Sequence, residues 1–213
     1  MISRPMTHLL IPLTLLAIGC SGSGGETPDR LTYPPPVETR SQVVLGFGDS
    51  ITFRPDSWCN QIPWCQAHGV PGETSREGVD RLLSGSVPIE GHRVILSWGV
   101  NDLRSQWTLS TTLDPIEEAV LHVLDHGGEP VLWIPTPQMD AASGEWHPVA
   151  NPRITETLGP AIVALAEHYG LRYVDAYGAI GTEVVLFDDY THPNEIGQWM
   201  IAQEVIRVLE EDE

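Results

Sequence analysis

Three residues in this chain of 213 could act together in nucleophilic catalysis. Ser50 lies in Gly-Asp-Ser-Ile-Thr at positions 48–52, and a serine hydroxyl becomes a nucleophile when a neighbouring base removes its proton. His192 can be that base, because an ordinary imidazole titrates near pH ~6.5 and so takes up and returns a proton at neutral pH. Asp189 precedes His192 by three residues, so its carboxylate can reach the imidazole, fix its tautomer and stabilise the imidazolium.

Two further segments could donate hydrogen bonds to a negatively charged intermediate. Gly72 offers a backbone N–H in a glycine-containing turn at 69–75, and Asn101 offers a side-chain amide in Gly-Val-Asn-Asp at 99–102. Taken singly, each motif has a simpler explanation, since a serine after Gly-Asp often caps a helix and Asp-x-x-His also occurs in solvated turns. Thr52 occupies the position of the second glycine in Gly-x-Ser-x-Gly, which argues against a standard α/β-hydrolase.

The strands that must position these residues can be predicted from hydrophobic patterning. Short apolar runs, each ended by polar residues, are typical of buried parallel strands. Helical periodicity fills the stretches between them, and this alternation predicts a parallel sheet with helices on both faces. We therefore expect one α/β domain, a three-layer α/β/α sandwich with a mainly parallel sheet of about five strands. The predicted strands are 43–48, 94–98, 131–134 and 171–175, with a further short strand at 65–68.

Three helices are expected in the second half of the chain. Asp114 and Pro115 predict the start of the first, as an acidic cap followed by proline in the first turn. The third is expected to begin near Asn194. Because the carboxyl ends of parallel strands meet at one edge of the sheet, the four motifs should lie together there. The inward-facing residues are expected to be Ile116, Val120, Val123 and Leu124 in the first helix, Ile154, Leu158, Ile162, Leu165 and Tyr169 in the second, and Ile196, Met200, Val205 and Val208 in the third.

Taken together, the four motifs resemble blocks I, II, III and V of the SGNH (GDSL-type) hydrolases, and they occur in the family's order. They read Gly-Asp-Ser-Ile-Thr, Gly-x-x-Gly-Glu-Thr-Ser, Gly-Val-Asn-Asp and Asp-Tyr-Thr-His-Pro-Asn, and the resemblance covers residues 43–208. It implies the flavodoxin-like SGNH hydrolase fold. By position, the family's catalytic Ser, Gly, Asn and His match Ser50, Gly72, Asn101 and His192, with Asp189 as the acid.

The resemblance implies an esterase that hydrolyses carboxylic esters through an acyl-enzyme on Ser50, with His192 and Asp189 as base and acid. The oxyanion would be held by the N–H groups of Ser50 and Gly72 and by the side chain of Asn101. No metal and no organic cofactor is expected, and the substrate would be a small-molecule or carbohydrate ester. Two alternatives stay open: an O-acyltransferase acting on sugars or lipids, and a catalytically silent surface binding module.

The N-terminal segment has the pattern of a signal peptide. One charge, Arg4, precedes a run of ten apolar residues, which is about half the length of a membrane-spanning helix. The run ends in Leu-Ala-Ile-Gly-Cys, which resembles the lipobox of bacterial lipoproteins, whose cysteine (here Cys20) becomes lipidated; a plain signal peptide is the alternative. We expect a signal peptide with lipobox at 1–20, a flexible linker at 21–40 and the hydrolase domain at 41–213, exported and anchored in the cell envelope, at the outer membrane or cell surface, through lipid alone.

Charge and cysteine content narrow the classes of partner. The chain has 29 acidic residues against 11 arginines, no lysine, and a net charge of −18. This negative charge argues against a nucleic-acid-binding protein, which would carry a basic stripe, and it favours a monomer because copies of the chain repel one another. Anionic esters should approach poorly unless Arg54, Arg76 or Arg104 gather at the cleft. Cys59 and Cys65 could form a disulfide in an oxidising compartment or remain free thiols.

Several further side chains could serve the site or the fold. His68 could reach the site from block II or pack as a structural histidine. His122 and His126 lie four apart on a helix and could hold a metal, but no third ligand is evident nearby, so an exposed helix face is expected. Four tryptophans fall in predicted loops, where they could stack on sugar rings, line an acyl channel or seal the loops. They are Trp58, Trp64, Trp107 and Trp146.

Overall fold

The computed structural model describes residues 42–104 and 107–211. These belong to one compact unit, Thr39–Glu213. The expected signal peptide at 1–20, the linker at 21–40 and the lipidation site Cys20 lie outside the described residues. None of the helices in the described part has the length and apolar character that crossing a membrane requires.

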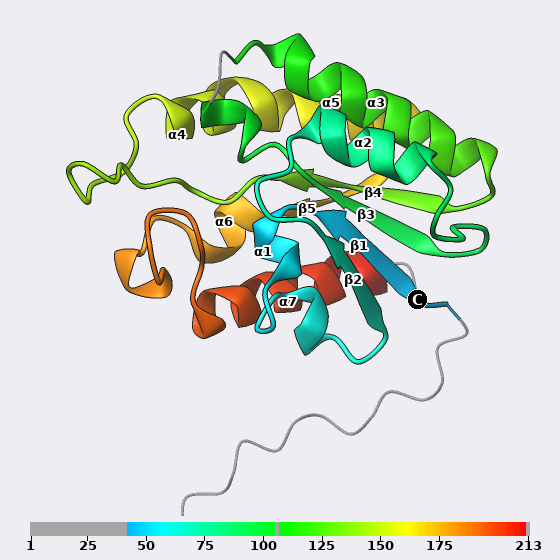
Figure 1. Ribbon diagram of the computed structural model, residues 1–213, viewed down its shortest axis with the longest axis horizontal. Helices are drawn as coiled ribbons and strands as arrows, with labels where there is room; N and C mark the ends of the chain where they lie inside the picture. Colours follow the sequence, from blue (N-terminus) through cyan, green and yellow to red (C-terminus); the bar gives the residue numbers. More distant parts are fainter. Residues whose placement is uncertain (1–41, 105–106, 212–213) are drawn as a thin grey trace, which may run out of the picture. The chain divides into compact units, whose positions relative to one another are not determined.

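All five predicted strands are present, and every pair in the sheet is parallel. Their spatial order is β2-β1-β3-β4-β5, the flavodoxin-like order that the family resemblance implies (Figure 1). Because β1 pairs with both β2 and β3, the chain reverses its winding direction there, and such switch points are where α/β sheets form their sites. The strands are β1 (Val44–Gly48), β2 (Cys65–Gly69), β3 (Arg93–Ser97), β4 (Glu129–Ile134) and β5 (Arg172–Asp175).

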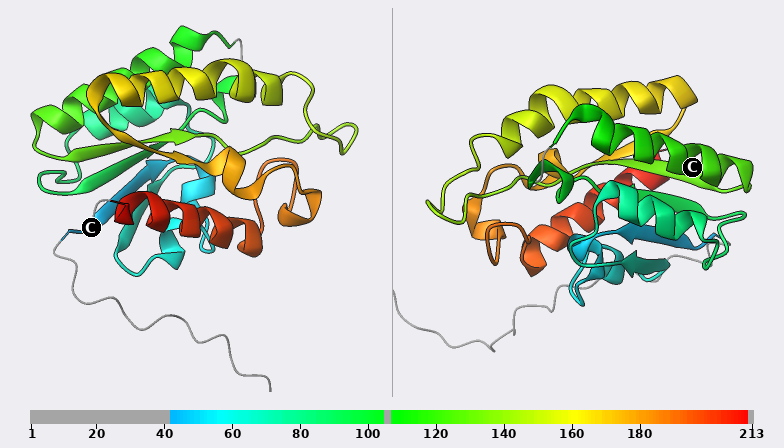
Figure 2. Two further views of the ribbon diagram at one scale, coloured as in Figure 1. Left: turned by 180° about the vertical axis from the view of Figure 1, so that it is seen from behind. Right: turned by 45° about the horizontal axis from the view of Figure 1, so that its top comes forward.

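Helices cover both faces of the sheet, which gives the expected three layers (Figures 1 and 2). One face carries α2 (Ser75–Leu83), α3 (Leu109–Asp125) and α5 (Gly159–Tyr169), and the other carries α1 (Ser50–Phe53), α6 (Ala176–Ile180) and α7 (Glu195–Glu210). The remaining helical turns are η1 (Cys59–Gln61), η2 (Asp102–Arg104), α4 (Ala150–Pro152), the π-helical η3 (Arg153–Leu158) and η4 (Val184–Leu186).

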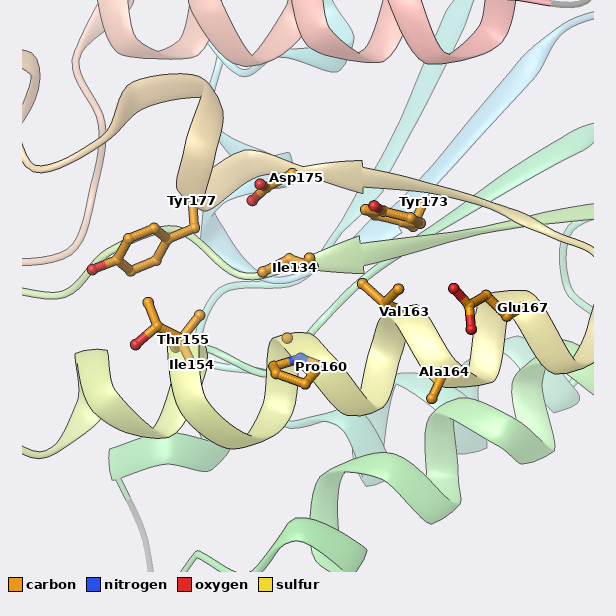
Figure 3. Close-up of a pocket in the computed structure, with 11 residues that line it drawn as sticks. Ile134, Ile154, Thr155, Pro160, Val163, Ala164, Glu167, Tyr173, Asp175 and Tyr177 are labelled. Atoms are coloured by element: carbon orange, nitrogen blue, oxygen red, sulfur yellow. The ribbon is translucent and has the colours of Figure 1, made fainter.

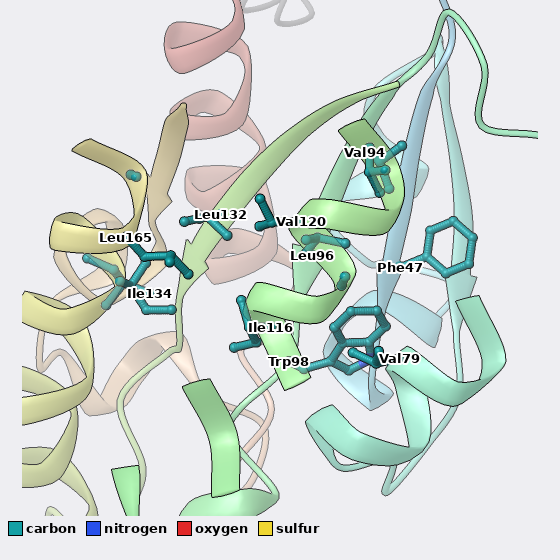
Figure 4. Close-up of a cluster of buried hydrophobic side chains, with 14 of the residues drawn as sticks. Phe47, Val79, Val94, Leu96, Trp98, Ile116, Val120, Leu132, Ile134 and Leu165 are labelled. Carbon is teal, nitrogen blue, oxygen red and sulfur yellow. The ribbon is translucent and has the colours of Figure 1, made fainter. Parts of the chain in front are cut away.

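The strands divide their side chains between two cores, one on each face of the sheet. In β3, Val94 and Leu96 pack under α2 and α3, whereas Ile95 packs on the α7 side, as the two-residue period of a strand requires. Figure 4 shows the first of these cores, where Trp98 lies beside Val79 of α2. Each fully buried aliphatic side chain contributes ~1.5–3 kcal/mol. The two cores therefore fix the sheet as a rigid base for the loops at its carboxyl edge.

Helix α3 begins earlier than the sequence pattern indicated. Asp114 and Pro115 do not start it; Thr108 does, through a capping box with Thr111. Pro115 lies inside the helix and has no N–H to donate to the Thr111 carbonyl. The Ser75 hydroxyl of the neighbouring helix lies 3.4 Å from that carbonyl oxygen, a weak contact, since its hydrogen is donated to Asp102 at 2.6 Å.

The predicted inward face of α7 was wrong at one position. Asn194 caps the helix, as expected from the sequence, but Ile196 is 61% exposed. Val205 and Val208 are buried as predicted and Met200 is partly buried, whereas Ile196 lies nine positions before Val205 and so on the opposite side of the helix. In α3, the inward prediction was wrong for Leu124, which is 41% exposed at the edge of the apolar stripe of Ile116, Val120 and Val123. The inward face predicted for the second helix is buried from its first residue to Leu165. Its buried residues are Ile154, Leu158, Ile162 and Leu165.

Candidate active site

Ser50 is the first residue of α1, directly after the central strand β1. Asp49 is 2% exposed and caps this short helix, since its Oδ1 accepts a hydrogen bond from the second N–H of the helix at 2.9 Å. A Cβ on Gly48 would lie 2.1 Å from the Ser97 hydroxyl oxygen, so only glycine fits there. The buried Thr52 hydroxyl is 2.7 Å from the same Ser97 oxygen, which explains why threonine replaces the second glycine of a nucleophile elbow.

A continuous chain of hydrogen bonds joins Ser50, His192 and Asp189. The Ser50 Oγ is 2.9 Å from His192 Nε2, and His192 Nδ1 is 2.7 Å from Asp189 Oδ2. A carboxylate can only accept, so Nδ1 carries the proton and Nε2 accepts from the serine hydroxyl. This is the arrangement in which an imidazole can take the serine proton.

The Asp189 carboxylate is held in its ionised form by donors from its own loop. Its Oδ1 accepts from the N–H groups of Thr191 and His192, both at 2.8 Å. Partial burial alone would raise the pKa of Asp189, but the hydrogen bonds from the imidazole and from these two N–H groups outweigh it and lower the pKa below its usual value. A charged acceptor therefore faces the imidazole at neutral pH.

The loop that carries Asp189 and His192 is closed on itself and tied at both ends. The Asp188 N–H donates to the His192 carbonyl at 2.9 Å, and the Asn194 side chain caps the helix that follows. Across the loop, the Met139 N–H donates to the Tyr190 carbonyl at 2.9 Å. The distance between Asp189 and His192 is thus set by contacts within the loop. The distance from His192 to Ser50 depends on contacts between the loop and the rest of the protein.

Gln198 of α7 supplies one of those outside contacts, and sequence reasoning missed it. Its side chain is fully buried; Nε2 donates to the Ile51 carbonyl at 3.3 Å, and Oε1 accepts from the Trp58 N–H at 2.9 Å. The helix that begins after His192 is therefore bonded to the residue that follows Ser50. A glutamine on the predicted buried face of an amphipathic helix was the available signal.

Of the two candidate oxyanion donors, Asn101 contacts the residue before the serine, and Gly72 lies in the loop to which Asn101 is bonded. Asn101 Nδ2 donates to the Glu73 carbonyl at 3.0 Å and lies 3.5 Å from Asp49 Oδ2, next to Ser50. Gly72 precedes Glu73 and has a φ of 80°, a conformation that favours glycine. All four loops of the sequence analysis therefore converge at the carboxyl edge of the sheet.

Glu73 supports the position of the Asn101 side chain, and this role was also not predicted from the sequence. It is 6% exposed, and its carboxylate accepts two hydrogen bonds from Arg81 at 2.7 Å and one from Trp98 Nε1 at 3.0 Å. Its backbone carbonyl is the acceptor that orients Asn101. An acidic residue inside a glycine turn gave no sign in sequence of these partners.

A second contact joins the loops of Gly72 and Asn101. The Asp102 carboxylate accepts from the Ser75 N–H at 3.0 Å and from its hydroxyl at 2.6 Å, and both side chains are buried. Asp102 thereby satisfies a free N–H at the start of α2. The two loops that supply the candidate donors are therefore fixed relative to each other.

His68, His122 and His126 have partners outside the candidate triad. The His68 ring stacks on Phe47 with centroids 5.1 Å apart, and burial together with the charge of Arg81 lowers the pKa of His68. His122 and His126 stack on each other on α3, with centroids 4.1 Å apart. Within the described ranges, no three His, Cys, Asp or Glu side chains are grouped so that they could hold a metal ion.

The tryptophans of the predicted loops pack inside the protein or on other loops. Trp58 is fully buried against Trp133, and its indole N–H donates to Thr52 at 3.2 Å. Trp146 contacts the ring of Phe187 edge-on. Trp107 lies under the Arg153 guanidinium, and Trp64 is half-buried beside the α7 core. Cys59 and Cys65 are joined in a disulfide that closes the segment between η1 and β2.

A cavity of about 470 Å³ lies along the β5 edge of the sheet, away from the triad. Figure 3 shows Tyr177 and Thr155 at one end of it and Glu167 near the other, with Ile134 between them. None of the residues that line it belongs to the four motif loops. The serine and histidine are instead part-buried at the surface, where the His192 side chain is 25% exposed.

Comparisons with known proteins agree with this architecture. The model of the GDSL-like lipase/acylhydrolase family matches residues 47–200. Among solved structures, a lipolytic G-D-S-L family protein of Veillonella parvula is similar at 18% identity and a TM-score of 0.64, over 80% of this chain and 100% of that one. The aryl esterase of M. smegmatis is similar at 19% identity and a TM-score of 0.62, over 79% and 100%. A carbohydrate acetylesterase of Sinorhizobium meliloti is similar at 15% identity and a TM-score of 0.62, over 79% and 98%. No curated protein sequence is significantly similar to this chain.

Proposed function

Since this chain belongs to the GDSL-like lipase/acylhydrolase family and is therefore a carboxylic ester hydrolase, we propose that Ser50, His192 and Asp189 are its catalytic triad. One observation carries the proposal. The hydrogen-bond chain from the Ser50 hydroxyl through both imidazole nitrogens to the carboxylate has the directions that proton transfer needs.

In the proposed reaction, Ser50 Oγ attacks the ester carbonyl carbon while His192 Nε2 takes the hydroxyl proton. The negative charge on the former carbonyl oxygen is held by the N–H groups of Ser50 and Gly72 and by the Asn101 amide. The bond to the alcohol oxygen breaks as the imidazolium returns its proton to that oxygen. Water, deprotonated by the same imidazole, then attacks the acyl carbon of the acyl-enzyme. The bond from that carbon to Ser50 Oγ breaks as the imidazolium returns the proton to Oγ, which releases the acid and free Ser50.

The Asn101 amide has one hydrogen available for the oxyanion. Its other N–H is fixed by the Glu73 carbonyl at 3.0 Å, and its contact with Asp49 at 3.5 Å is too long to be a strong bond. An oxyanion would therefore replace a weak contact. Losing one such donor typically raises the barrier by about 3 kcal/mol.

Exposed apolar side chains beside the triad support an uncharged, partly apolar substrate. Phe53 is 55% exposed, Val70 39% and Tyr190 43%, and each lies within three residues of a proposed catalytic group. Where such side chains form a contiguous patch they mark a binding surface, and we propose that these three do so around the triad. They support an acyl or alcohol group with hydrocarbon or aromatic character.

The charges near the site support the same preference. Arg54 is paired with Asp56 and Asp188, and Arg76 also has two carboxylate partners, so neither is a free cation for an anionic ester. The side chain of Arg104 lies outside the part of the chain that the structure describes. We propose that neutral esters are hydrolysed faster than anionic ones of the same size.

A panel of esters tests this function. It should contain aryl esters with acyl chains of increasing length, acetylated sugars, and an anionic ester matched in size to a neutral one. We expect turnover of short neutral esters by the wild type and none by a folded Ser50→Ala variant. Equal turnover by the two proteins would refute the assignment of the nucleophile. Sugar or lipid alcohols added to the panel would reveal acyl transfer, because transferred product would then form at the expense of free acid.

We also propose that the enzyme is an exported lipoprotein, on the strength of the lipobox-like end of its first twenty residues. Expression in a bacterium fed a radiolabelled fatty acid tests this. Label on the wild type and none on a Cys20→Ser variant would support the proposal. An unlabelled, uncleaved wild-type chain would contradict it.

A further inference from the structure

Arg54 connects the serine segment to the loop that carries the proposed base and acid. It directly follows α1, and its N–H donates to the Ser50 carbonyl at 3.3 Å. Its guanidinium reaches Asp56 with Nε at 3.1 Å from Oδ1 and Nη2 at 3.3 Å from Oδ2. The same Nη2 also bonds the carboxylate of Asp188, which lies 134 residues away in sequence.

Asp188, the second carboxylate partner of Arg54, is adjacent in sequence to the proposed acid. Asp188 directly precedes Asp189, and its backbone N–H closes the loop by donating to the His192 carbonyl. A displacement of Asp188 would therefore displace Asp189 and His192 together. The Arg54 side chain is 27% exposed and that of Asp188 is 46% exposed, so the ion pair itself should add little to the stability of the fold.

We propose that Arg54 is a positioning residue: by binding Asp188 it holds the loop of His192 and Asp189 against the serine segment. In its kinetic consequences this inference rests on the proposed function. Proton transfer from Ser50 Oγ needs the 2.9 Å separation from the imidazole, and a displacement of about 1 Å can cost up to ~100-fold in rate. Gln198 anchors the start of the following helix, whereas Arg54 acts on the loop itself.

Arg54 also balances the carboxylates around the imidazole. Asp189 bonds His192 directly, Asp188 lies on the same loop, and Asp56 interacts with the His192 charge from the serine side. The hydrogen bond from Arg54 lowers the pKa of Asp56, so that carboxylate is ionised at neutral pH. Glu195, on the helix that follows, adds a further negative charge. The guanidinium therefore offsets part of the negative charge around the proposed base.

The first test compares Arg54→Met with a matched control. Arg76 likewise bridges two carboxylates, Asp80 and Glu118, but between α2 and α3. We expect kcat on a short neutral ester to fall ~10-fold in Arg54→Met with KM unchanged within about twofold. Arg54→Lys should recover part of the loss, since it keeps the charge, and Arg76→Met should behave as wild type. Equal kinetics for Arg54→Met and Arg76→Met would overturn the proposal.

A double-mutant cycle shows whether Arg54 acts through Asp188. In an Asp188→Asn background, Arg54→Met should cause little further loss of kcat, because the contact is already broken. Fully additive losses would contradict the proposed route.

The crystal structure of Arg54→Met, compared with that of Arg76→Met, does not depend on turnover. In Arg54→Met the distance from Ser50 Oγ to His192 Nε2 should lengthen from 2.9 Å by about 1 Å, whereas Arg76→Met should keep it. If the wild type hydrolyses no ester, the proposed function fails, and this distance still decides the role of Arg54. An unchanged distance in Arg54→Met would overturn it.

Discussion

Replacing Asp189 by asparagine keeps the shape of the side chain and removes its charge. In the structure, Oδ1 accepts two backbone N–H groups at 2.8 Å, and Oδ2 accepts from His192 Nδ1 at 2.7 Å. The amide oxygen of an asparagine must stay with the two backbone donors. Its NH₂ group then faces Nδ1, which has to become an acceptor. The proton moves to Nε2, and the imidazole can no longer take the proton of Ser50.

The magnitude follows from these contacts. Turning the amide over would restore the correct tautomer, but it would break two hydrogen bonds worth ~1 kcal/mol each and set donors against donors. A cost of about 2–3 kcal/mol leaves roughly 1 molecule in 30 to 150 in the productive arrangement. The lost charge would also stabilise the imidazolium less. We therefore expect Asp189→Asn to lower kcat by at least ~30–150-fold, and by up to ~10⁴-fold where the lost charge contributes as in other triads.

The assay is the steady-state hydrolysis of a short-chain nitrophenyl ester, followed by absorbance. Asp114→Asn, an exposed carboxylate on α3, is the control for the same change of charge. Circular dichroism should show that both variants remain folded. If Asp189→Asn retains turnover within tenfold of wild type, Asp189 is not the acid of the triad and the tautomer argument is wrong.

Three further predictions concern the support of the site and its acid sensitivity. Glu73→Ala should destabilise the protein by about 3 kcal/mol, because it removes the carboxylate that accepts from the Arg81 guanidinium and from the Trp98 indole N–H. Urea unfolding measures this change, and a loss of stability below about 1 kcal/mol would contradict it. Gly78→Ala should lower the free energy of unfolding by ~1–3 kcal/mol, since the new Cβ would lie 2.2 Å from the Trp98 ring. Calorimetry measures this loss, and an unchanged melting temperature would refute the close packing of Gly78 on Trp98. The lowered pKa of Asp189 means that its stabilising contacts are complete above the unfolded pKa of ~3.9 and are lost as the pH falls further. The difference in melting temperature between wild type and Asp189→Asn should therefore be constant above about pH 5 and shrink as the pH falls from ~4 to ~2. A difference that stays constant down to pH ~2 would contradict this.

The strands and the candidate triad were predictable because each depends on local pattern. The apolar runs around residues 43–48 and 131–134 are short and are ended by polar residues, as is typical of buried strands, and a parallel sheet brings their ends together. The start of α3 was not predictable in this way. Asp114 and Pro115 carry a strong helix-start signal, but Thr108 starts the helix through a complete capping box with Thr111, and Pro115 is accommodated inside it.

The residues that hold the site in place were the part that sequence could not reveal. Arg54 was expected only as a cation for anionic substrates, and the structure pairs it with Asp56 and Asp188. Glu73 and Gln198 each bond partners that come together only after the sheet has formed. Their roles depend on contacts across as many as 147 residues, and no local pattern encodes such contacts.

Labelling with a fluorophosphonate probe, read out by mass spectrometry, tests the central claim most directly. Such probes phosphorylate a serine whose hydroxyl is activated by a neighbouring base. We predict one adduct per folded chain, on the peptide that contains Ser50, and none in the Ser50→Ala variant. A folded wild-type protein that stays unlabelled, or that is labelled equally in the variant, would contradict the assignment of Ser50 as the nucleophile.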